Sequence, residues 1–561
     1  MKSESLKNAA VGSLVGATLV TGVIFLAPGW AQDPTPPAPG PAARARAAVG
    51  TGAAASLGDL NALIRDREKW LRKHPRDEES WAVLGSAYLE RGSRLADTAY
   101  YPKAEVALRR SLEAVPADKG NVEAVVGLAA LANARHDFAE GRSLGEFAKK
   151  LKPKAWTAYP ALIDAYNGLG DYKSAGKALD RLQKLHSGPS VQGRTAEVYR
   201  DLGWREDAAA TAHDAMARAQ APEEKATALH RLGELAWERG EPVEAAGHFN
   251  AALRASRGHH PSLAGRARAL AAQGRTDEAL RDYQAALAKA PLLEYALEAG
   301  ELYESLGLDG DARTQYELLQ TRAARAAGHG VNEELVLARY ETEHGDPESA
   351  VGRLQAEWRL GHRSVYVMDA MAWALYRSGR AEEALPFAKK ATDMGMRDAV
   401  FAYHRGEIER ALGLYGAARR HIGEALRTNP YFSPLLAPLA RATLTDLGEP
   451  PEGGPRKVVG DEPDPTPTPR QSTSSAPSRR EPSPTSSSGT GTGSGTGAGA
   501  GQAPVQPAPA RTSTPAEPPR TTQPTRRWEP SPGAGAGTGT GTGSSGWSSG
   551  PGASPQARPV P

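Results

Sequence analysis

A sequence repeat of about 34 residues runs through the middle of this chain and limits the folds open to it. Each unit carries a glycine that ends one helical pattern and an alanine five residues later, inside the next pattern. Ten units carry these marks. Two are degenerate, because an extra loop over 93–100 separates Gly92 from Ala104, and because His136 and Gly141 replace the usual residues. The eight regular pairs are Gly170 with Ala175, Gly203 with Ala208, Gly240 with Ala245, Gly274 with Ala279, Gly307 with Ala312, Gly345 with Ala350, Gly379 with Ala384 and Gly413 with Ala418.

Each unit is expected to form two amphipathic helices, since apolar residues return every three or four positions on both sides of the glycine. The glycine suits a left-handed helix terminator, and the alanine suits a close crossing of the two helices. Prolines end several second helices, at Pro116, Pro153, Pro291 and Pro430. One pair cannot bury its apolar face alone, so the pattern predicts stacked pairs in a solenoid with an open concave and an open convex surface.

The first unit resembles the tetratricopeptide repeat signature: Trp81, Leu84, Gly85 and Tyr88 are followed by Ala104, Leu108, Ser111 and Pro116. Later units repeat parts of this pattern, and the resemblance covers residues 78–432. It implies an all-α fold, a right-handed superhelical solenoid of about ten helix-turn-helix repeats, and composition predicts disordered ends. Phrases such as Ala372-Trp373-Ala374-Leu375-Tyr376 also resemble bacterial repeat proteins, and the high Ala, Arg and Gly content agrees with a GC-rich genome.

The segments beside the repeats have distinct compositions. Residues 32–56 form a predicted Pro/Ala-rich linker, and residues 57–77 form a capping helix with apolar residues on one face. The solenoid itself is expected over 78–447, with a closing helix from Phe432 to Leu447. Residues 448–561 are rich in Pro, Ser, Thr and Gly and predict a disordered tail, which is a spacer, a glycosylated stalk or a solubilising tail.

The amino terminus predicts contact with a membrane. Lys2 and Lys7 precede an uncharged run over 9–27, and Gly29 and Ala31 have the small-x-small spacing that a signal peptidase accepts. The run is also about as long as a short spanning helix needs. Residues 1–31 are therefore a cleaved signal peptide or a retained transmembrane anchor. Either alternative predicts an exported protein, secreted or membrane-anchored, with the repeats outside the cytoplasm.

Composition and motifs argue against several functions. The formal net charge of +3 gives no strong field for nucleic acid, and the absence of cysteine excludes disulfides and thiolate chemistry. No metal-hydrolase or phosphate-loop motif is present, and the adjacent His259 and His260 point about 100° apart on a helix. The sequence predicts no catalytic residues, no metal and no cofactor, and an enzyme is the least favoured function.

The resemblance implies that partner segments bind along the first helix of each unit, which faces the concave groove. We expect an unidentified protein or peptide partner, and membrane contact through the amino-terminal segment only. Aromatic and arginine residues often dominate binding energy. The alternative is that Trp373 and Tyr376 pack between the last two units. The partner-binding residues predicted on this basis are Trp237, Arg268, Arg339, Asp369, Trp373, Tyr376, Arg377, Tyr403, Glu407 and Arg410.

Repeats that hold acidic carboxyl-terminal peptides present Lys and Asn at two groove positions, and the resemblance places Ala82 with Ser86 and His230 with Glu234 there. Binding of such peptides is therefore disfavoured. The predicted function is a protein-protein interaction scaffold at the cell envelope that binds partners in its concave groove. The alternative is an envelope assembly or structural factor that uses its convex face.

Overall fold

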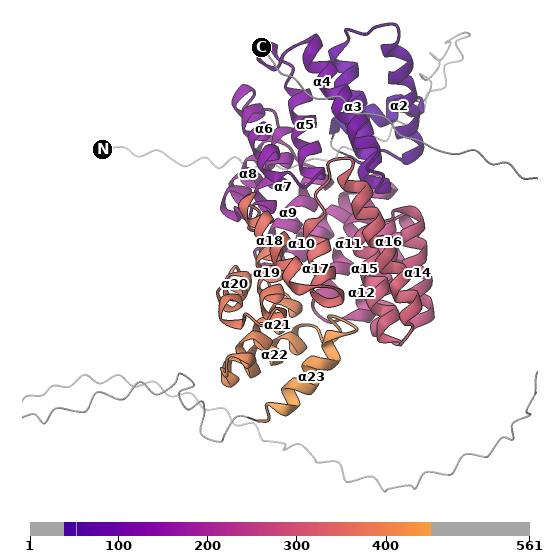
Figure 1. The fold of residues 1–561 in the computed structure, drawn as a ribbon. Coiled ribbons are helices and arrows are strands. Elements are labelled where there is room, and N and C mark those ends of the chain that lie inside the picture. Colours follow the sequence, from indigo (N-terminus) through magenta and orange to yellow (C-terminus); the bar gives the residue numbers. More distant parts are fainter. Residues whose placement is uncertain (1–38, 52, 450–561) are drawn as a thin grey trace, which may run out of the picture. The chain divides into compact units, whose positions relative to one another are not determined.

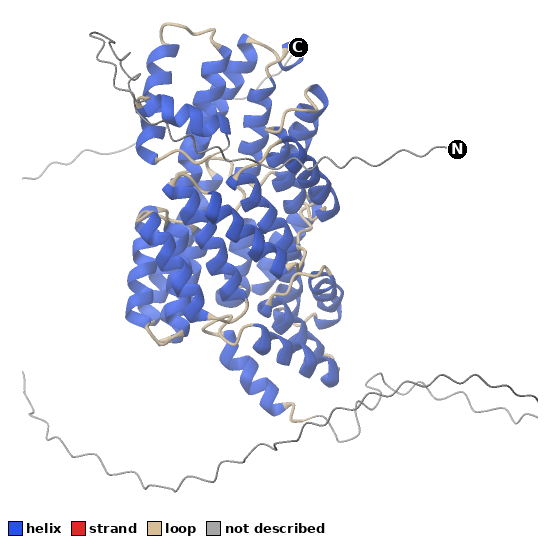
Figure 2. Ribbon diagram, turned by 180° about the vertical axis from the view of Figure 1, so that it is seen from behind, coloured by secondary structure: helices blue, strands red, loops and turns tan. Residues whose placement is uncertain are grey.

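The computed structural model describes residues 39–51 and 53–449, and all regular elements in these ranges are helices (Figures 1 and 2). The predicted signal or anchor over 1–31 lies outside the described residues, as does the predicted tail from residue 450 onward. Among the helices that the structure does describe, none is long and apolar enough to cross a bilayer.

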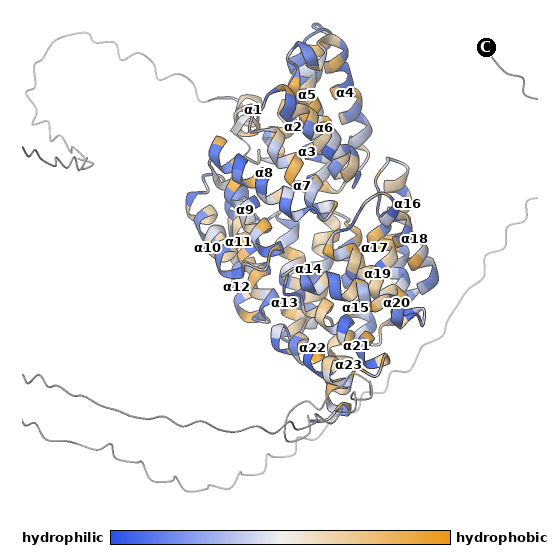
Figure 3. Ribbon diagram, turned by 90° about the vertical axis from the view of Figure 1, so that its left-hand side faces the viewer, coloured by the Kyte–Doolittle hydropathy of each residue, from blue (hydrophilic) through white to orange (hydrophobic). Residues whose placement is uncertain are grey.

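Ten helix pairs follow one another between Glu78 and Thr428, which confirms the predicted all-α solenoid. The helices are amphipathic and carry hydrophilic and hydrophobic residues side by side (Figure 3). The pairs are α3 (Glu78–Leu95) with α4 (Tyr100–Ala114), α5 (Val122–Ala134) with α6 (Phe138–Leu151), α7 (Ala158–Gly168) with α8 (Tyr172–Leu185), α9 (Pro189–Asp201) with α10 (Arg205–Arg218), α11 (Pro222–Glu238) with α12 (Pro242–Ala255), α13 (His260–Ala272) with α14 (Thr276–Lys289), α15 (Leu293–Ser305) with α16 (Asp309–Ala327), α17 (Glu334–His344) with α18 (Pro347–Arg359), α19 (Val365–Arg377) with α20 (Ala381–Asp393) and α21 (Ala399–Ala411) with α22 (Tyr415–Thr428).

The glycines of the eight regular units follow the end of the first helix of each pair, and all but one adopt the predicted left-handed conformation, whereas Gly92 of the first unit lies inside α3. Gly240 has a φ of +74°, and the following Glu241 donates its backbone N–H to the Ala236 carbonyl at 3.0 Å, which closes a left-handed helix cap. His136 replaces the glycine in the second unit and also adopts a left-handed φ of +58°. Gly345 is the exception, since its φ is −141° and Asp346 caps the next helix with its side chain.

The repeated alanines lie where the two helices of a pair cross. Ala175, Ala245 and Ala418 are fully buried, and a larger side chain would force the helices apart. Close approach is also needed on the first helices, where a Cβ added to Gly233 would lie 2.5 Å from the ring of Phe249. The repeated alanines and glycines are therefore explained by the close packing of the two helices inside each unit.

The segments at the two ends of the array are helical. α2 (Leu57–Leu71) is the predicted capping helix, and α23 (Leu436–Asp446) lies within the predicted closing helix. The predicted linker over 32–56 was wrong over 41–51, because α1 (Pro41–Thr51) forms there and buries Ala45 against α2. A short Ala-rich helix of this kind gains most of its stability from such packing, which composition does not reveal.

Successive turns of the superhelix contact each other across about 190 residues of sequence. Val365 at the start of α19 donates its backbone N–H to the Tyr172 hydroxyl of α8 at 3.0 Å, and His136 Nδ1 donates to the Asn332 carbonyl at 2.6 Å. Gly203 lies directly against the Gly395 carbonyl. In Figure 1, α18 and α19 accordingly lie beside α8, α9 and α10. The second turn therefore packs on the first, a contact for which the repeat pattern gives no signal.

Residues 93–95 and 100 of the predicted extra loop over 93–100 are helical, and 96–99 connect the two helices. α3 continues to Leu95, Ala96 ends it with a left-handed φ of +49°, and α4 begins at Tyr100. The short connection places the Thr98 hydroxyl 2.8 Å from His329 Nδ1 on the next turn. The insertion therefore extends the contact between turns.

Candidate functional site

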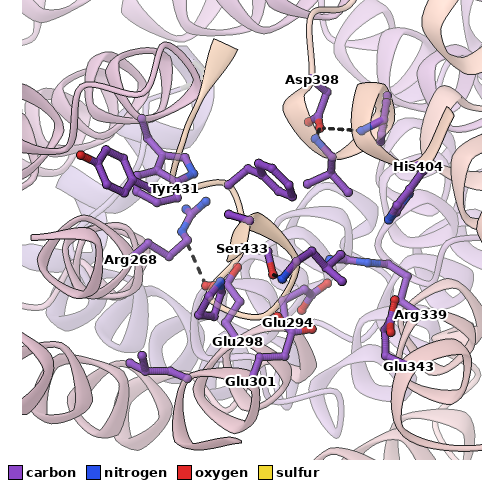
Figure 4. Close-up of a pocket in the computed structure, with 18 of the residues that line it drawn as sticks. Arg268, Glu294, Glu298, Glu301, Arg339, Glu343, Asp398, His404, Tyr431 and Ser433 are labelled. Atoms are coloured by element: carbon purple, nitrogen blue, oxygen red, sulfur yellow. Dashed lines mark hydrogen bonds and ion pairs between the residues drawn. The ribbon is translucent and has the colours of Figure 1, made fainter. Parts of the chain in front are cut away.

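A cavity of about 630 Å³ lies on the inner surface of the superhelix, among the helices α9–α21 and the segment from Tyr431 to Arg441 (Figure 4). The first helices α11, α13, α15, α17, α19 and α21 each contribute side chains to it. Residues 431–441 line it as well, so the closing segment is part of the site. The cavity is lined by both charged and aromatic residues.

One ion network in the cavity is centred on Arg268 of α13. Its Nη2 donates to both oxygens of Glu234, at 2.7 and 2.9 Å, and its Nε lies 3.5 Å from Glu298. The Tyr283 hydroxyl donates to Glu298 at 3.0 Å. Burial raises the pKa of Glu298 although Arg268 and Tyr283 oppose this, whereas Arg268 overcomes burial at Glu234 and lowers its pKa. One guanidinium therefore neutralises two carboxylates only in part.

A second network surrounds Arg200 of α9. The guanidinium pairs with Glu238 of α11 and donates to the Tyr366 hydroxyl of the next turn at 3.2 Å. Asp201 lies 3.5 Å from it, and burial raises the pKa of Asp201 to about 6. Burial also raises the pKa of Glu238. This network joins the two turns of the superhelix through charged groups.

His404 of α21 and Asp369 of α19 form a buried pair beside the cavity. His404 Nδ1 lies 3.0 Å from the Asp369 carboxylate, and its ring stacks on Trp373 with centroids 4.0 Å apart. A carboxylate only accepts hydrogen bonds, so Nδ1 carries the hydrogen. The opposite nitrogen, Nε2, is buried and has no hydrogen-bond partner within the described chain.

The structure divides the ten predicted partner-binding residues into two groups. Trp237, Arg268, Arg339, Asp369 and Trp373 line the cavity. The other five lie beside it on α19 and α21: Tyr376, Arg377, Tyr403, Glu407 and Arg410. The binding role of both groups stays a prediction.

The second group forms a packed cluster. Tyr376 stacks on Trp373 at 4.9 Å, Arg377 pairs with Glu343, and Arg410 donates to Glu407 at 2.7 Å. Tyr403 is 3% exposed and its ring lies 5.5 Å from that of Phe432. Trp373, at 6% exposed, and half-buried Tyr376 pack between the last two units, the alternative that the sequence left open.

Several cavity residues were missed by the sequence analysis. Glu294 and Glu298 lie near the start and middle of α15, and Tyr431 and Phe432 precede α23. They fall outside the groove positions that the resemblance implies, or in the segment treated as a cap. Residues of the second turn, on α19 and α21, also line the cavity. The repeat pattern in the sequence does not indicate which residues of the two turns meet. Within residues 39–449 no group of three or more His, Asp or Glu is arranged to hold a metal ion.

Comparisons with known proteins found solved structures similar to this chain. The sequence matches no protein-family model and no curated protein. The structure is similar to the Cut9 and Hcn1 hetero-tetramer of APC/C, with 14% identity, 70% of this chain and 82% of that chain covered, and a TM-score of 0.38. It is also similar to the human IFIT1 dimer with PPP-AAAA, with 16% identity and a TM-score of 0.39. That match covers 63% of this chain and 81% of that chain. A tetratricopeptide repeat protein from Parabacteroides merdae is 18% identical, with coverage of 46% and 98% and a TM-score of 0.29.

Proposed function

We propose that this chain is a protein-interaction scaffold that binds a segment of a partner protein in the inner cavity of its superhelix. It acts at the cell envelope, as an exported protein that is secreted or held by its amino-terminal segment. The cavity is the observation that carries the proposal.

The lining of the cavity suits the binding of a peptide segment. Tyr366 is 36% exposed and lines the cavity, where its ring lies 5.9 Å from the buried ring of Phe401, so Tyr366 offers aromatic surface to a side chain that enters. Carboxylates and guanidiniums around it supply hydrogen-bond acceptors and donors. A volume of about 630 Å³ accommodates a few residues of an extended segment and not a folded domain.

The test is partner capture by the full-length chain with one tyrosine removed at a time. Tyr366→Ala removes an exposed ring from the cavity, and Tyr415→Ala removes a 57% exposed ring that does not line it. We expect Tyr366→Ala to weaken capture about tenfold, as for a binding hot spot, and Tyr415→Ala to leave it unchanged. Equal capture by both variants would contradict binding in the cavity.

A third variant separates the cavity from the convex-face alternative. Phe147 on α6 is 45% exposed and lies outside the cavity lining. Loss of capture in Phe147→Ala, with Tyr366→Ala unaffected, would instead assign partner binding to the outer face.

The location at the envelope has its own test, the amino-terminal mass of the mature protein in a bacterial host. A terminus at Gln32 identifies a released protein, and an intact Met1 in the membrane fraction identifies an anchored one. An intact Met1 in the cytosolic fraction would contradict the proposed location.

A further inference from the structure

The carboxylates of the inner cavity outnumber its guanidiniums. Among the described residues that line it, eight are aspartate or glutamate and four are arginine. Burial raises the pKa of Glu238 and of Glu298, and burial together with the neighbouring Asp369 raises the pKa of Asp398. A raised pKa means that the positive groups nearby do not fully compensate the ionised carboxylate. The cavity therefore favours the entry of further positive charge.

Three of these carboxylates lie on one face of α15. Glu294, Glu298 and Glu301 are spaced by four and three residues, which places them side by side on a helix, and all line the cavity (Figure 4). Like charges at this spacing destabilise a helix. Arg268 lies 3.5 Å from Glu298. The Nε2 of His344 lies 3.9 Å from Glu301, and Glu294 forms no ion pair with any described residue. The row of three carboxylates is thus only partly compensated.

His404 of α21 is a second, independent indication of a ligand. Its Nδ1 donates to Asp369, so Nε2 of the neutral ring is an acceptor. The residue is 6% exposed and lines the cavity, and its Nε2 has no hydrogen-bond partner in the described chain. A buried acceptor without a donor is unfavourable, and a donor that enters the cavity relieves this.

A basic peptide segment supplies both kinds of group. Its lysine or arginine side chains carry positive charge and only donate hydrogen bonds, and its backbone carries further N–H donors. An acidic segment is disfavoured, because it brings more negative charge beside the row on α15. A metal ion is disfavoured as well, because no group of three His, Asp or Glu in the described part of the chain is arranged to hold one.

We propose that the partner segment bound in the inner cavity is basic. A lysine or arginine side chain pairs with the carboxylates of α15, and a separate N–H of the same segment donates to His404 Nε2. This inference rests on the proposed function, since it names the chemistry of the segment that the cavity binds. Charge complementarity of this kind selects among partners and speeds their association.

Binding of defined peptides to the full-length chain tests the charge of the occupant. The probes are fluorescein-labelled pentapeptides with one arginine, lysine, citrulline or glutamate between two pairs of alanines, and fluorescence anisotropy gives their dissociation constants. Citrulline has the shape of arginine without its charge. We expect the arginine and lysine peptides to bind at least about tenfold more tightly than the citrulline peptide, and the glutamate peptide to bind least tightly.

Two matched double variants locate the charge. Glu294→Gln with Glu301→Gln removes two carboxylates from the cavity, and Glu317→Gln with Glu382→Gln removes two exposed carboxylates outside it. The first variant should bind the arginine peptide about tenfold more weakly and the citrulline peptide as the parent does. The second should bind all the peptides as the parent does. Because both variants have the same net charge, a difference between them reports the cavity itself.

Nitrogen-15 NMR of the histidine-labelled full-length chain tests the acceptor. The signals of His404 are assigned by their loss in His404→Gln. We expect an unprotonated Nε2 whose signal shifts when the arginine peptide is added, because this nitrogen gains a donor. A protonated Nε2, or a signal that does not move at saturating peptide, would contradict the role of His404.

Three results with the peptides would overturn the basic segment. They are equal affinity for the arginine and citrulline peptides, no binding of either basic peptide at about 1 mM, and a preference for arginine that survives in the cavity variant. The proposed function is judged separately, by partner capture in Tyr366→Ala. If that variant weakens capture while the peptides show no preference for positive charge, the cavity binds a partner segment of another chemistry.

Discussion

The side chain of Asn429 donates a hydrogen bond to the backbone carbonyl of Trp237, which lies 192 residues earlier in the sequence, at 2.8 Å. Asn429 is 3% exposed, and its Oδ1 accepts from the Tyr431 backbone at 2.9 Å. The residue therefore links the last repeat to α11 and orients the segment that lines the cavity. We predict that Asn429→Ala lowers the free energy of unfolding by about 1–3 kcal/mol, since one buried and one half-buried hydrogen bond are lost.

Denaturant unfolding of the full-length chain measures this change. Asn61→Ala is the control, because the Asn61 side chain on α2 makes no hydrogen bond within the described part of the chain, and its effect should stay within about 0.5 kcal/mol. Similar losses in both variants would mean that the link between the turns adds no stability.

Two glycines with the same backbone conformation separate the contact between turns from backbone strain. Gly203 has a φ of +78°, and an added Cβ would lie 2.0 Å from the Gly395 carbonyl oxygen, whereas Gly274 has a φ of +74° and open space around it. Alanine at either position costs about 1–2 kcal/mol for the left-handed conformation. We predict that Gly203→Ala loses at least about 1 kcal/mol more than Gly274→Ala, because the turns must separate.

Thermal unfolding and hydrogen exchange of the loop between α20 and α21 check this difference. Faster exchange there should appear in Gly203→Ala only. Equal destabilisation by the two alanines would show that the two turns do not rest on each other at this point.

The stability of the protein should depend on the ionisation of Asp201. Burial raises its folded-state pKa to about 6 from 3.8, so the folded state holds a proton that the unfolded state has released between these values. Stability from this group is thus lost as the pH rises from about 4 to 6, and the loss is constant above that. Asp201→Asn should remove this loss. The free energy of unfolding of the variant should therefore rise relative to that of the parent by up to about 3 kcal/mol between pH 4 and 6.

Urea unfolding at pH 4, 5, 6 and 7 measures the gain. Asp309→Asn on the exposed start of α16 serves as the control and should show no such change between pH 4 and 6. A constant difference between Asp201→Asn and the parent at all four pH values would contradict the burial of this carboxylate.

Arg268 should stabilise the fold by neutralising cavity carboxylates. We predict that Arg268→Gln lowers the free energy of unfolding by about 2 kcal/mol, less than for a fully buried pair because 26% of the side chain is exposed. Adding Glu234→Gln should restore part of this loss, since the unpaired charge is removed with its partner. A double-mutant cycle with no coupling between the two positions would contradict the ion pair.

The internal structure of each unit could be predicted from sequence because it depends on residues close together in the chain. Gly240 and Ala245 mark a helix end and a helix crossing within one repeat, and both have the predicted roles. The same local pattern placed Trp373 on the first helix of a late unit, where it lines the cavity. The periodicity of the sequence therefore predicts which residues of the site lie on the first helices.

The contacts between turns could not be predicted, since the residues that make them have no periodic signature. Tyr172 and Val365 are 193 residues apart, and their meeting depends on the accumulated rotation of the intervening repeats. The cavity and the unpaired His404 nitrogen follow from this rotation. The helix over 41–51 was missed because it is stabilised by packing on α2.

The central claim, that a partner segment binds in the inner cavity, is tested most directly by photo-crosslinking in the native cell. A photoreactive p-benzoylphenylalanine replaces either Tyr366, which lines the cavity, or Tyr415, which is 57% exposed elsewhere. The account predicts a crosslink to a separate protein from position 366 and none from position 415. A separate protein crosslinked from position 415 and absent from position 366 would contradict it.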